Sequence, residues 1–424
     1  RDGRPLTTIS STVAQRLFNV DVPLGQLVRF NRLRLTNGAT GGLGGAIAAT
    51  GAGTVNIFEC EFFGNHAAQG GGAVAAIGAS LQLHDADFHD NSADDKGGAL
   101  YATGSVDLHD SSFWNNSNNA ASHREAIRLE DGVEGRVENL TLSNNSGGIR
   151  LVNFAAVIVR ELTIVDNTST GLRAEQAQPF GQLQLHANIL SGNGLDCSAT
   201  AANYGGSYNL INSGSCPVSN GDINGNPGLA PALTRRDGKI SRVRVPLAGS
   251  PVLDAVPNGT VACAGSDQYG NNRPTDTDAN SVAACEIGAL ELFPAENAPQ
   301  VFTVNVFDQD RDDVNPGDTL CDTSSDVGPQ CTLRAAIMEA NALPGANTVQ
   351  IVTPAASLVL TQANAGGGAS AADGDLDITD AVSIIGVSGS PNVRPIIQSS
   401  SGDRIFNINA PGDNVLIRGL RLSG

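Results

Sequence analysis

The sequence predicts an all-β fold, a right-handed parallel β-helix with a short capping helix and a disulfide-stapled cap where two modules join. Two observations carry this prediction. One is a set of internal repeats whose period equals one coil of such a solenoid. The other is a composition of 50 glycines and only 4% aromatic residues in 424 residues. Many small residues and turns suit repeated short strands better than a core of large rings.

Two repeats run out of phase with each other through residues 44–200. In the first, Gly-Gly-Ala precedes an aliphatic residue at Ile47, Val74 and Leu100. Leucine-rich repeats have a similar period, but their pattern is missing, and a propeller blade needs about 40 residues or more. The second repeat brings an asparagine to the end of a short apolar segment every 22 to 29 residues. Its members are Asn65, Asn91, Asn116, Asn145, Asn167 and Asn193.

Short alternating segments between these landmarks predict the strands of each coil. Val55-Asn56-Ile57 places two apolar side chains on one face and a polar one on the other, as does Leu81-Gln82-Leu83 one coil later. We expect the asparagine after each strand to adopt a left-handed conformation and turn the chain. Stacked in register, these asparagines can also hydrogen-bond from coil to coil.

A longer repeat joins the two ends of the chain. Arg4-Pro5 recurs as Arg394-Pro395 at an offset of 390 residues, and the offset is 388 at the Phe18 and Phe406 pair and 387 at the Leu35 and Leu422 pair. The same coils therefore occur twice, and we expect the chain to be cut within a solenoid at both ends. The interpretation is a tandem array with a unit of about 390 residues. The alternative is the central part of a protein with two divergent modules.

Seven cysteines form three local groups and one remainder. The sequence predicts three loop-stapling disulfides in an oxidising compartment, with Cys60 unpaired. The metal alternative is weaker, because the chain has no Cys-x-x-Cys motif and His186 is the nearest histidine to any paired cysteine. The expected pairs are Cys197 with Cys216, Cys263 with Cys285, and Cys321 with Cys331.

Residues 302–351 resemble the CSLREA-type domain that opens many secreted bacterial β-helix proteins. The resemblance rests on Cys-Thr-Leu-Arg-Ala-Ala-Ile from Cys331, followed by Glu-Ala-Asn ending at Asn341. Thr332 replaces the usual serine, and Ala335 also departs from the motif. Residues 332–342 should form a short amphipathic helix that closes the mouth of the solenoid, with Leu333, Ile337 and Ala340 on one side.

Residues 250–292 resemble the choice-of-anchor Q segment found at the opposite end of such proteins. The shared motifs begin at Ser250, Asp267 and Cys285, and the resemblance implies a C-terminal cap tied by a disulfide. Both resemblances imply a secreted or surface protein of bacterial origin. The expected organisation is coils in 1–245, a cap in 246–293, a linker in 294–299, the plug of the next module in 300–345, and its first coils in 346–424.

Two groups of polar residues are candidate sites. His84 and Asp85 recur one coil later as His109 and Asp110, which could place acid–base groups together on one outer sheet. The alternative is a polar outward face copied from coil to coil by duplication. Asp308, Asp310 and Asp312 offer hard oxygen ligands for a structural calcium ion, although the glycine and distal glutamate of an EF-hand are missing.

The charge balance narrows the function. With 25 basic and 43 acidic residues, the net charge of −18 argues against binding nucleic acid or anionic lipid. No apolar run of 18 residues predicts a membrane span. We expect a structural, non-enzymatic segment of an extracellular fibre, stalk or surface scaffold that joins copies of itself or adjacent modules head to tail. The alternatives are a polysaccharide lyase or glycosidase on the same fold, and an adhesin for surface glycans.

Overall fold

The computed structural model divides the chain into two compact units. Unit 1 comprises residues 1–227, 237–243 and 251–291, and unit 2 comprises residues 228–236, 244–250 and 292–424. The structure describes residues 6–120, 124–175, 181–199, 203–235, 239–277, 282–292, 299–317, 319–323, 330–343, 346–352, 357–362, 374–387, 394–400, 404–410 and 414–423.

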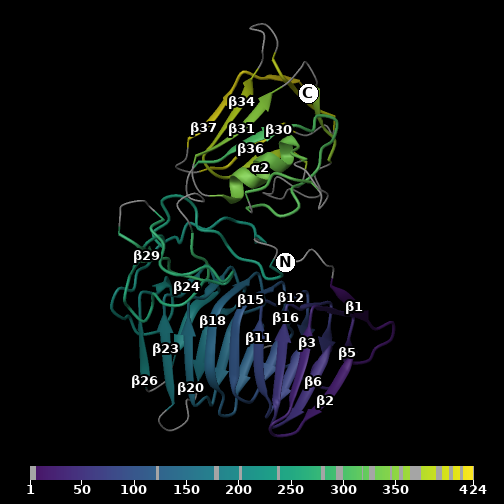
Figure 1. Cartoon of the computed structure of the whole chain (residues 1–424), viewed down its shortest axis with the longest axis vertical. Coiled ribbons are helices and arrows are strands. Elements are labelled where there is room, and N and C mark those ends of the chain that lie inside the picture. The colour runs from purple at the N-terminus through teal and green to yellow at the C-terminus, as the bar shows by residue number, and fades with distance from the viewer. Residues whose placement is uncertain are drawn as a thin grey trace. The chain divides into compact units, whose positions relative to one another are not determined.

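Unit 1 is a solenoid whose coils stack strand on strand in parallel register (Figure 1). Each full coil visits three faces, here called A, B and C, and several coils add a fourth short strand. Face A contains β2 (Phe18–Val22), β6 (Ile47–Gly51), β10 (Val74–Ile77), β14 (Leu100–Ala102), β17 (Ile127–Glu130), β19 (Ile149–Val152), β22 (Thr170–Glu175) and β25 (Leu195–Ala199).

Faces B and C are ladders of one 15-stranded sheet, because two long strands, β15 (Val106–Trp114) and β18 (Glu134–Ser143), run through both. Face B also contains β3 (Leu27–Asn31), β7 (Thr54–Phe58), β11 (Ser80–His84), β20 (Ala156–Arg160), β23 (Gln182–His186) and β26 (Asn203–Ser207). Face C also contains β1 (Thr7–Ser10), β4 (Leu33–Thr36), β8 (Glu61–Phe63), β12 (Asp87–His89), β21 (Thr163–Val165), β24 (Ile189–Ser191) and β27 (Leu210–Ile211). The short fourth strands are β5 (Ala39–Thr40), β9 (His66–Ala67), β13 (Ser92–Ala93) and β16 (Ser117–Asn118).

The interior of unit 1 is built from columns of identical position in successive coils. The rings of Phe62, Phe88 and Phe113 stack with centroids 4.5 and 4.6 Å apart, and all three side chains are buried. The alternation predicted for Val55-Asn56-Ile57 is confirmed, since its two aliphatic side chains are buried and the asparagine is partly exposed. Offset stacking of aromatic rings adds to the stabilisation that burial provides.

The six predicted asparagines form one ladder along the inner corner of the solenoid, and the first five of them are buried. From Asn91 onward, the Oδ1 atom of each accepts both the backbone N–H and the Nδ2–H of the asparagine in the preceding coil, at 2.8–3.1 Å. Each Nδ2 also donates to a backbone carbonyl oxygen of an earlier coil, as Asn116 does to Phe88. The ladder therefore satisfies buried polar groups that would otherwise destabilise the corner.

The left-handed residue of this corner is not the ladder asparagine, so that part of the prediction is wrong. Positive φ angles of 52–70° fall on the residue just before each one. These residues are Gly64, Asp90, Asn115, Asn144, Asp166 and Gly192. The physical reason is that the preceding residue makes the turn, which leaves the asparagine free to point its amide inward.

A second polar row, which the sequence analysis missed, lies near the end of unit 1. Asn188 donates from Nδ2 to Oδ1 of Asn209 at 2.9 Å, and Asn209 donates in the same way to Asp222 at 3.1 Å. The parallel strands of the unit 1 coils end at β27. Residues 212–235 and 239–245, which were expected to be coils, carry isolated bridges but no strand. Glycine, proline and asparagine are frequent in residues 212–228, which favours turns over strands.

The cap predicted near residues 246–293 lies, within unit 1, along the flank of the coils. This cap and the segment 239–243 dock on a column of outward side chains on face C, Ser112, Thr141 and Thr163. Ser112 Oγ accepts from the Arg242 N–H at 2.9 Å, Thr141 Oγ1 donates to Gln268 at 2.7 Å, and Thr163 Oγ1 accepts from the Ala289 N–H at 3.1 Å. A short antiparallel pair, β28 (Val256–Pro257) and β29 (Ala284–Cys285), lies in the cap.

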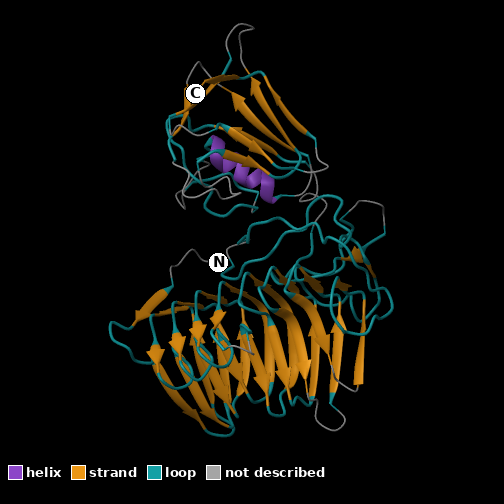
Figure 2. Ribbon diagram, turned by 180° about the vertical axis from the view of Figure 1, so that it is seen from behind, coloured by secondary structure: helices purple, strands orange, loops and turns teal. Residues whose placement is uncertain are grey.

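Unit 2 is a smaller set of coils, and a helix lies against its inner strands (Figure 2). The predicted helix is α2 (Leu333–Ala342), which begins after Thr332, whose Oγ1 accepts from the Ala335 N–H. The helix buries Leu333, Ile337 and Ala340 as predicted and contacts β30, β31 and β33. The strands are β30 (Val301–Val304), β31 (Asn347–Val352), β32 (Ser357–Leu360), β33 (Leu376–Ile378), β34 (Val382–Val387), β35 (Ile396–Ser399), β36 (Phe406–Ile408), β37 (Val415–Arg418) and β38 (Arg421–Ser423).

The long repeat in the sequence corresponds to the same element order in both units. The first coil of unit 1 runs β1, β2, β3 and β4, and the last described coil of unit 2 runs β35, β36, β37 and β38. In unit 1, β1 pairs with β4, and Thr8 lies opposite Arg34. In unit 2, β35 pairs with β38, and Ile396 lies opposite Arg421. The recurring residues thus occupy equivalent strands with equivalent neighbours.

The three predicted disulfides are present. Cys197 is bonded to Cys216, Cys263 to Cys285 and Cys321 to Cys331. Cys60 is a free, buried thiol, and burial raises its pKa to about 11. At neutral pH this thiol is therefore protonated and a poor nucleophile.

Replacing the central ladder residue Asn116 by alanine should lower the free energy of unfolding of unit 1 by about 2–4 kcal/mol. The change leaves the buried donors of Asn91 without their acceptor and the Phe88 carbonyl without its donor. Urea unfolding measures the loss. Asn119→Ala is the control, because Asn119 makes an exposed hydrogen bond to Asp94, and it should cost under about 0.5 kcal/mol. Equal effects of the two variants would contradict a stabilising ladder.

Candidate functional site: a histidine–aspartate groove on unit 1

The site begins with a corner that every coil of unit 1 repeats where face B turns into face C. The last residues of the face B segments form one column of register partners, and the residue after each has a φ angle of 46–58°. The column itself consists of Phe58, His84, His109, Glu138, Arg160 and His186. The left-handed residues are Glu59, Asp85, Asp110, Asn139, Glu161 and Ala187.

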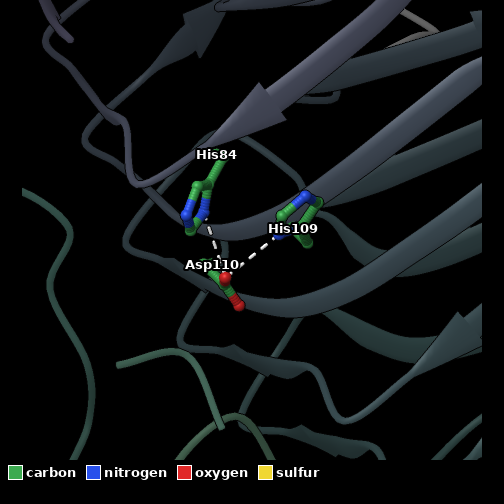
Figure 3. A group of neighbouring side chains, drawn as sticks. All are labelled: His84, His109 and Asp110. Atoms are coloured by element: carbon green, nitrogen blue, oxygen red, sulfur yellow. Dashed lines mark hydrogen bonds and ion pairs between the residues drawn. The ribbon is translucent and has the colours of Figure 1, made fainter. Parts of the chain in front are cut away.

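Two adjacent coils of this corner bring His84, His109 and Asp110 together (Figure 3). The imidazole rings are stacked with centroids 4.6 Å apart, because His84 and His109 are direct register partners. Both Nδ1 atoms approach the same carboxylate oxygen, Oδ2 of Asp110, at 3.1 Å from His84 and 3.0 Å from His109. The sequence analysis predicted the equivalence of the two histidines, and the structure adds the shared oxygen.

The histidines and Asp110 stabilise each other's charged forms. Burial lowers the pKa of His109, but the hydrogen bond and negative charge of Asp110 outweigh burial and raise it above the ordinary value. Burial raises the pKa of the Asp110 carboxyl, but the contacts and charge of the two imidazoles outweigh burial and lower it. Asn139 supports the other carboxylate oxygen, since its Nδ2 donates to Asp110 Oδ1 at 3.2 Å and to the Ser266 carbonyl at 2.7 Å.

A groove of about 490 Å³ opens at this cluster, between the corner column and the cap segments of unit 1. Its lining combines the cluster with basic side chains from neighbouring coils and from the cap. Arg136 and Arg160 both contact Glu138, at 3.7 and 3.2 Å, and Arg136 also contacts Asp107 at 3.0 Å. The groove is lined by His84, His109, Asp110, Arg136, Glu138, Asn139, Arg160, Lys239, Gly265, Ser266 and Gly270.

Asp85, the fourth predicted member, does not join the cluster. Its carboxylate is buried, and Oδ1 accepts the backbone N–H groups of Ile240 and Ser241 at 3.0 and 3.1 Å. Asp85 and Asp110 have the same corner conformation, so repetition alone made them look alike. The difference comes from the segment 239–243, which covers Asp85 and leaves Asp110 open to the groove.

A second cluster, Glu61, Asp87 and His89, lies on face C, in the coil that contains His84 and the coil before it. Its groups are already paired. Glu61 contacts Arg34 at 2.7 Å and His89 at 3.3 Å, and Asp87 Oδ1 accepts from Ser112 Oγ and Trp114 Nε1 at 2.7 and 2.8 Å. The Trp114 ring stacks on His89 with centroids 4.3 Å apart. This arrangement is a closed polar network that supports packing.

The predicted calcium ligands in unit 2 do not form a cation site in the described residues. Asp310 forms a buried ion pair with Arg334 at 2.7 Å and also accepts the N–H groups of Thr361 and Gln362. Asp312 accepts from the Gln362 side chain, and Asp308 is exposed. The arginine supplies the positive charge that the sequence analysis assigned to calcium.

Comparison with known proteins agrees with this architecture. Residues 45–223 match the family model described as the right handed beta helix region. The coils and this match together define a right-handed parallel β-helix protein. No curated protein and no solved structure gives a significant match. Among the residues that the structure describes, no helix combines the length and apolar character needed to cross a membrane.

Removal of the Asp310 carboxylate should destabilise unit 2 by about 3–5 kcal/mol, because Asp310→Ala leaves the Arg334 guanidinium buried without its counter-charge. The loss, measured by urea unfolding, should be the same in calcium and in chelator. Asp308→Ala, at the exposed neighbouring position, should change stability by under about 0.5 kcal/mol. A calcium-dependent stabilisation that both variants abolish would restore the calcium interpretation.

Proposed function

We propose that this chain is a structural segment of an extracellular scaffold, a fibre, stalk or surface layer, built from tandem β-helix modules. The observation that carries the proposal is the recurrence of one coil in both units, as β1 to β4 and as β35 to β38. A chain that contains the same coil twice is the expected product of tandem duplication. The partners are adjacent modules of the same chain or further copies of it, joined head to tail.

Further features support an extracellular location. Three disulfides require an oxidising environment to persist, which favours a secreted protein. The segments that resemble the CSLREA-type and choice-of-anchor Q domains coincide with the region around α2 and with the cap. Their bacterial relatives are secreted or surface proteins, and this chain would have the same destination.

The proposal is tested by splicing the chain at the equivalent coils. In the spliced chain, residue 423 is joined directly to residue 37. This junction keeps the coil intact, because Leu35 and Leu422 are equivalent positions. Residues 1–423 joined to residues 37–291 should contain one complete module in its second half. Electron microscopy should show that half as a single rigid rod, and limited proteolysis should leave the junction intact.

The matched control joins residue 423 to residue 54, which starts β7 and so omits a strand of face A at the junction. This variant should show a flexible, protease-sensitive joint, because the strand needed to continue face A is missing. If both spliced chains are cut equally at the junction, the two coils are not equivalent and the tandem proposal fails.

The groove supports a second candidate, binding and cleavage of an acidic polysaccharide. The observation in its favour is the meeting of an imidazole–carboxylate cluster with Arg136, Arg160 and Lys239 at one opening. This candidate predicts release of new chain ends from polyuronates and at least about a 100-fold loss of rate in His109→Ala. His66→Gln, outside the groove, is the control. No release from a panel of polyuronates would remove this candidate and leave the scaffold proposal untouched.

A further inference from the structure

The strongest feature that the scaffold function does not use is the convergence of two imidazoles on one carboxylate oxygen. The three ligand atoms, one from each of His84, His109 and Asp110, lie within 4.8 Å of one another. Two of the separations are 3.0 and 3.1 Å. In a tetrahedral zinc site with bonds of about 2.0–2.1 Å, ligand atoms are about 3.3 Å apart. The cluster is therefore close to the spacing that a bound ion would impose.

Hydrogen bonding alone leaves this cluster incomplete. His109 Nδ1 makes a hydrogen bond to Asp110, whereas the buried Nδ1 of His84 makes none, although it lies 3.1 Å from the same oxygen. A cation between the three groups would take the lone pair of this nitrogen and share the carboxylate oxygen.

The surroundings hold the ligands in place. Asn139 donates to Asp110 Oδ1, which leaves Oδ2 facing the imidazoles, and such support is typical of residues that orient metal ligands. Phe58 packs on the outer side of the His84 ring with centroids 4.8 Å apart, and His109 stacks on the other side. The His84 ring is therefore held between two aromatic neighbours in the column.

The two arginines beside the cluster are paired with carboxylates, which offsets their charge. The Arg136 guanidinium is paired with Asp107 and Glu138, and the Arg160 guanidinium with Glu138. Glu138 lies between His109 and Arg160 in the column, and Arg136 is the register partner of Asp107, so a carboxylate neighbours each arginine. The second cluster, around His89, is a poorer candidate for a cation site. Its carboxylates are already bonded to Arg34, Ser112 and Trp114.

We propose that His84, His109 and Asp110 bind a divalent transition-metal ion of the zinc class through His84 Nδ1, His109 Nδ1 and Asp110 Oδ2. Two nitrogen donors and one carboxylate favour this class over calcium or magnesium, which prefer oxygen ligands. The site has three protein ligands and opens to the groove, which leaves a fourth position for water or an anionic ligand.

The experiment titrates the chelator-treated 424-residue chain with ZnCl₂ by calorimetry and with CoCl₂ by visible absorption. The expected result is one ion per chain at this site and a cobalt spectrum of nitrogen–oxygen coordination. His84→Ala, His109→Ala and Asp110→Asn should each weaken binding by at least about 100-fold, and Asn139→Ala by about 10- to 100-fold. His66→Gln and His186→Gln, at histidines outside the cluster, should bind as the unchanged protein does.

X-ray absorption at the zinc edge of the unchanged protein keeps the test decisive if a variant misfolds. Two imidazole nitrogens in the ligand shell are expected. The proposal is overturned if the chain binds no ion, if the His84→Ala, His109→Ala double variant retains full binding, or if His89→Gln alone abolishes it.

Discussion

The structure of unit 1 depends on keeping successive coils in exact lateral register. Side chains in a strand alternate between faces, so a slip of one residue would turn the buried aliphatic columns outward. Backbone hydrogen bonds between parallel strands do not by themselves distinguish one register from the next. The asparagine ladder does, because each buried Oδ1 must meet both the N–H and the Nδ2–H of one particular partner. The ladder therefore fixes which residue of one coil lies over which residue of the next.

Fixed register also explains how a polar site arises on a repetitive scaffold. His84 and His109 are stacked because they are partners in a column, and Asp110 is near them because the corner after His109 is left-handed. Most members of this column are ordinary surface residues. Only where two coils carry the same imidazole, next to a corner carboxylate left open by the cap, do the groups converge.

The features that could be predicted from the sequence are those that local patterns determine. The coils, the ladder positions, the disulfide pairs and the helix over residues 332–342 follow from period, spacing and amphipathic pattern. The errors at the candidate site residues involve partners that are distant in sequence. Asp85 looked equivalent to Asp110 until the backbone of Ile240 was seen to bind it, and Asp310 looked like a calcium ligand until Arg334 was seen to pair with it. Neither contact has a local signal, because each depends on how a non-repeating segment packs.

The left-handed corner accepts chemically unrelated residues in successive coils. Glutamate, aspartate, asparagine and alanine all occupy it with nearly the same backbone angle, between 46° and 58°. Its shape is thus maintained by the strands on either side and is insensitive to the side chain. The side chain at this corner can therefore differ from one coil to the next, about 4.8 Å away, while the backbone keeps one shape. The solenoid thus combines a constant backbone with a row of corner positions whose side chains differ from coil to coil.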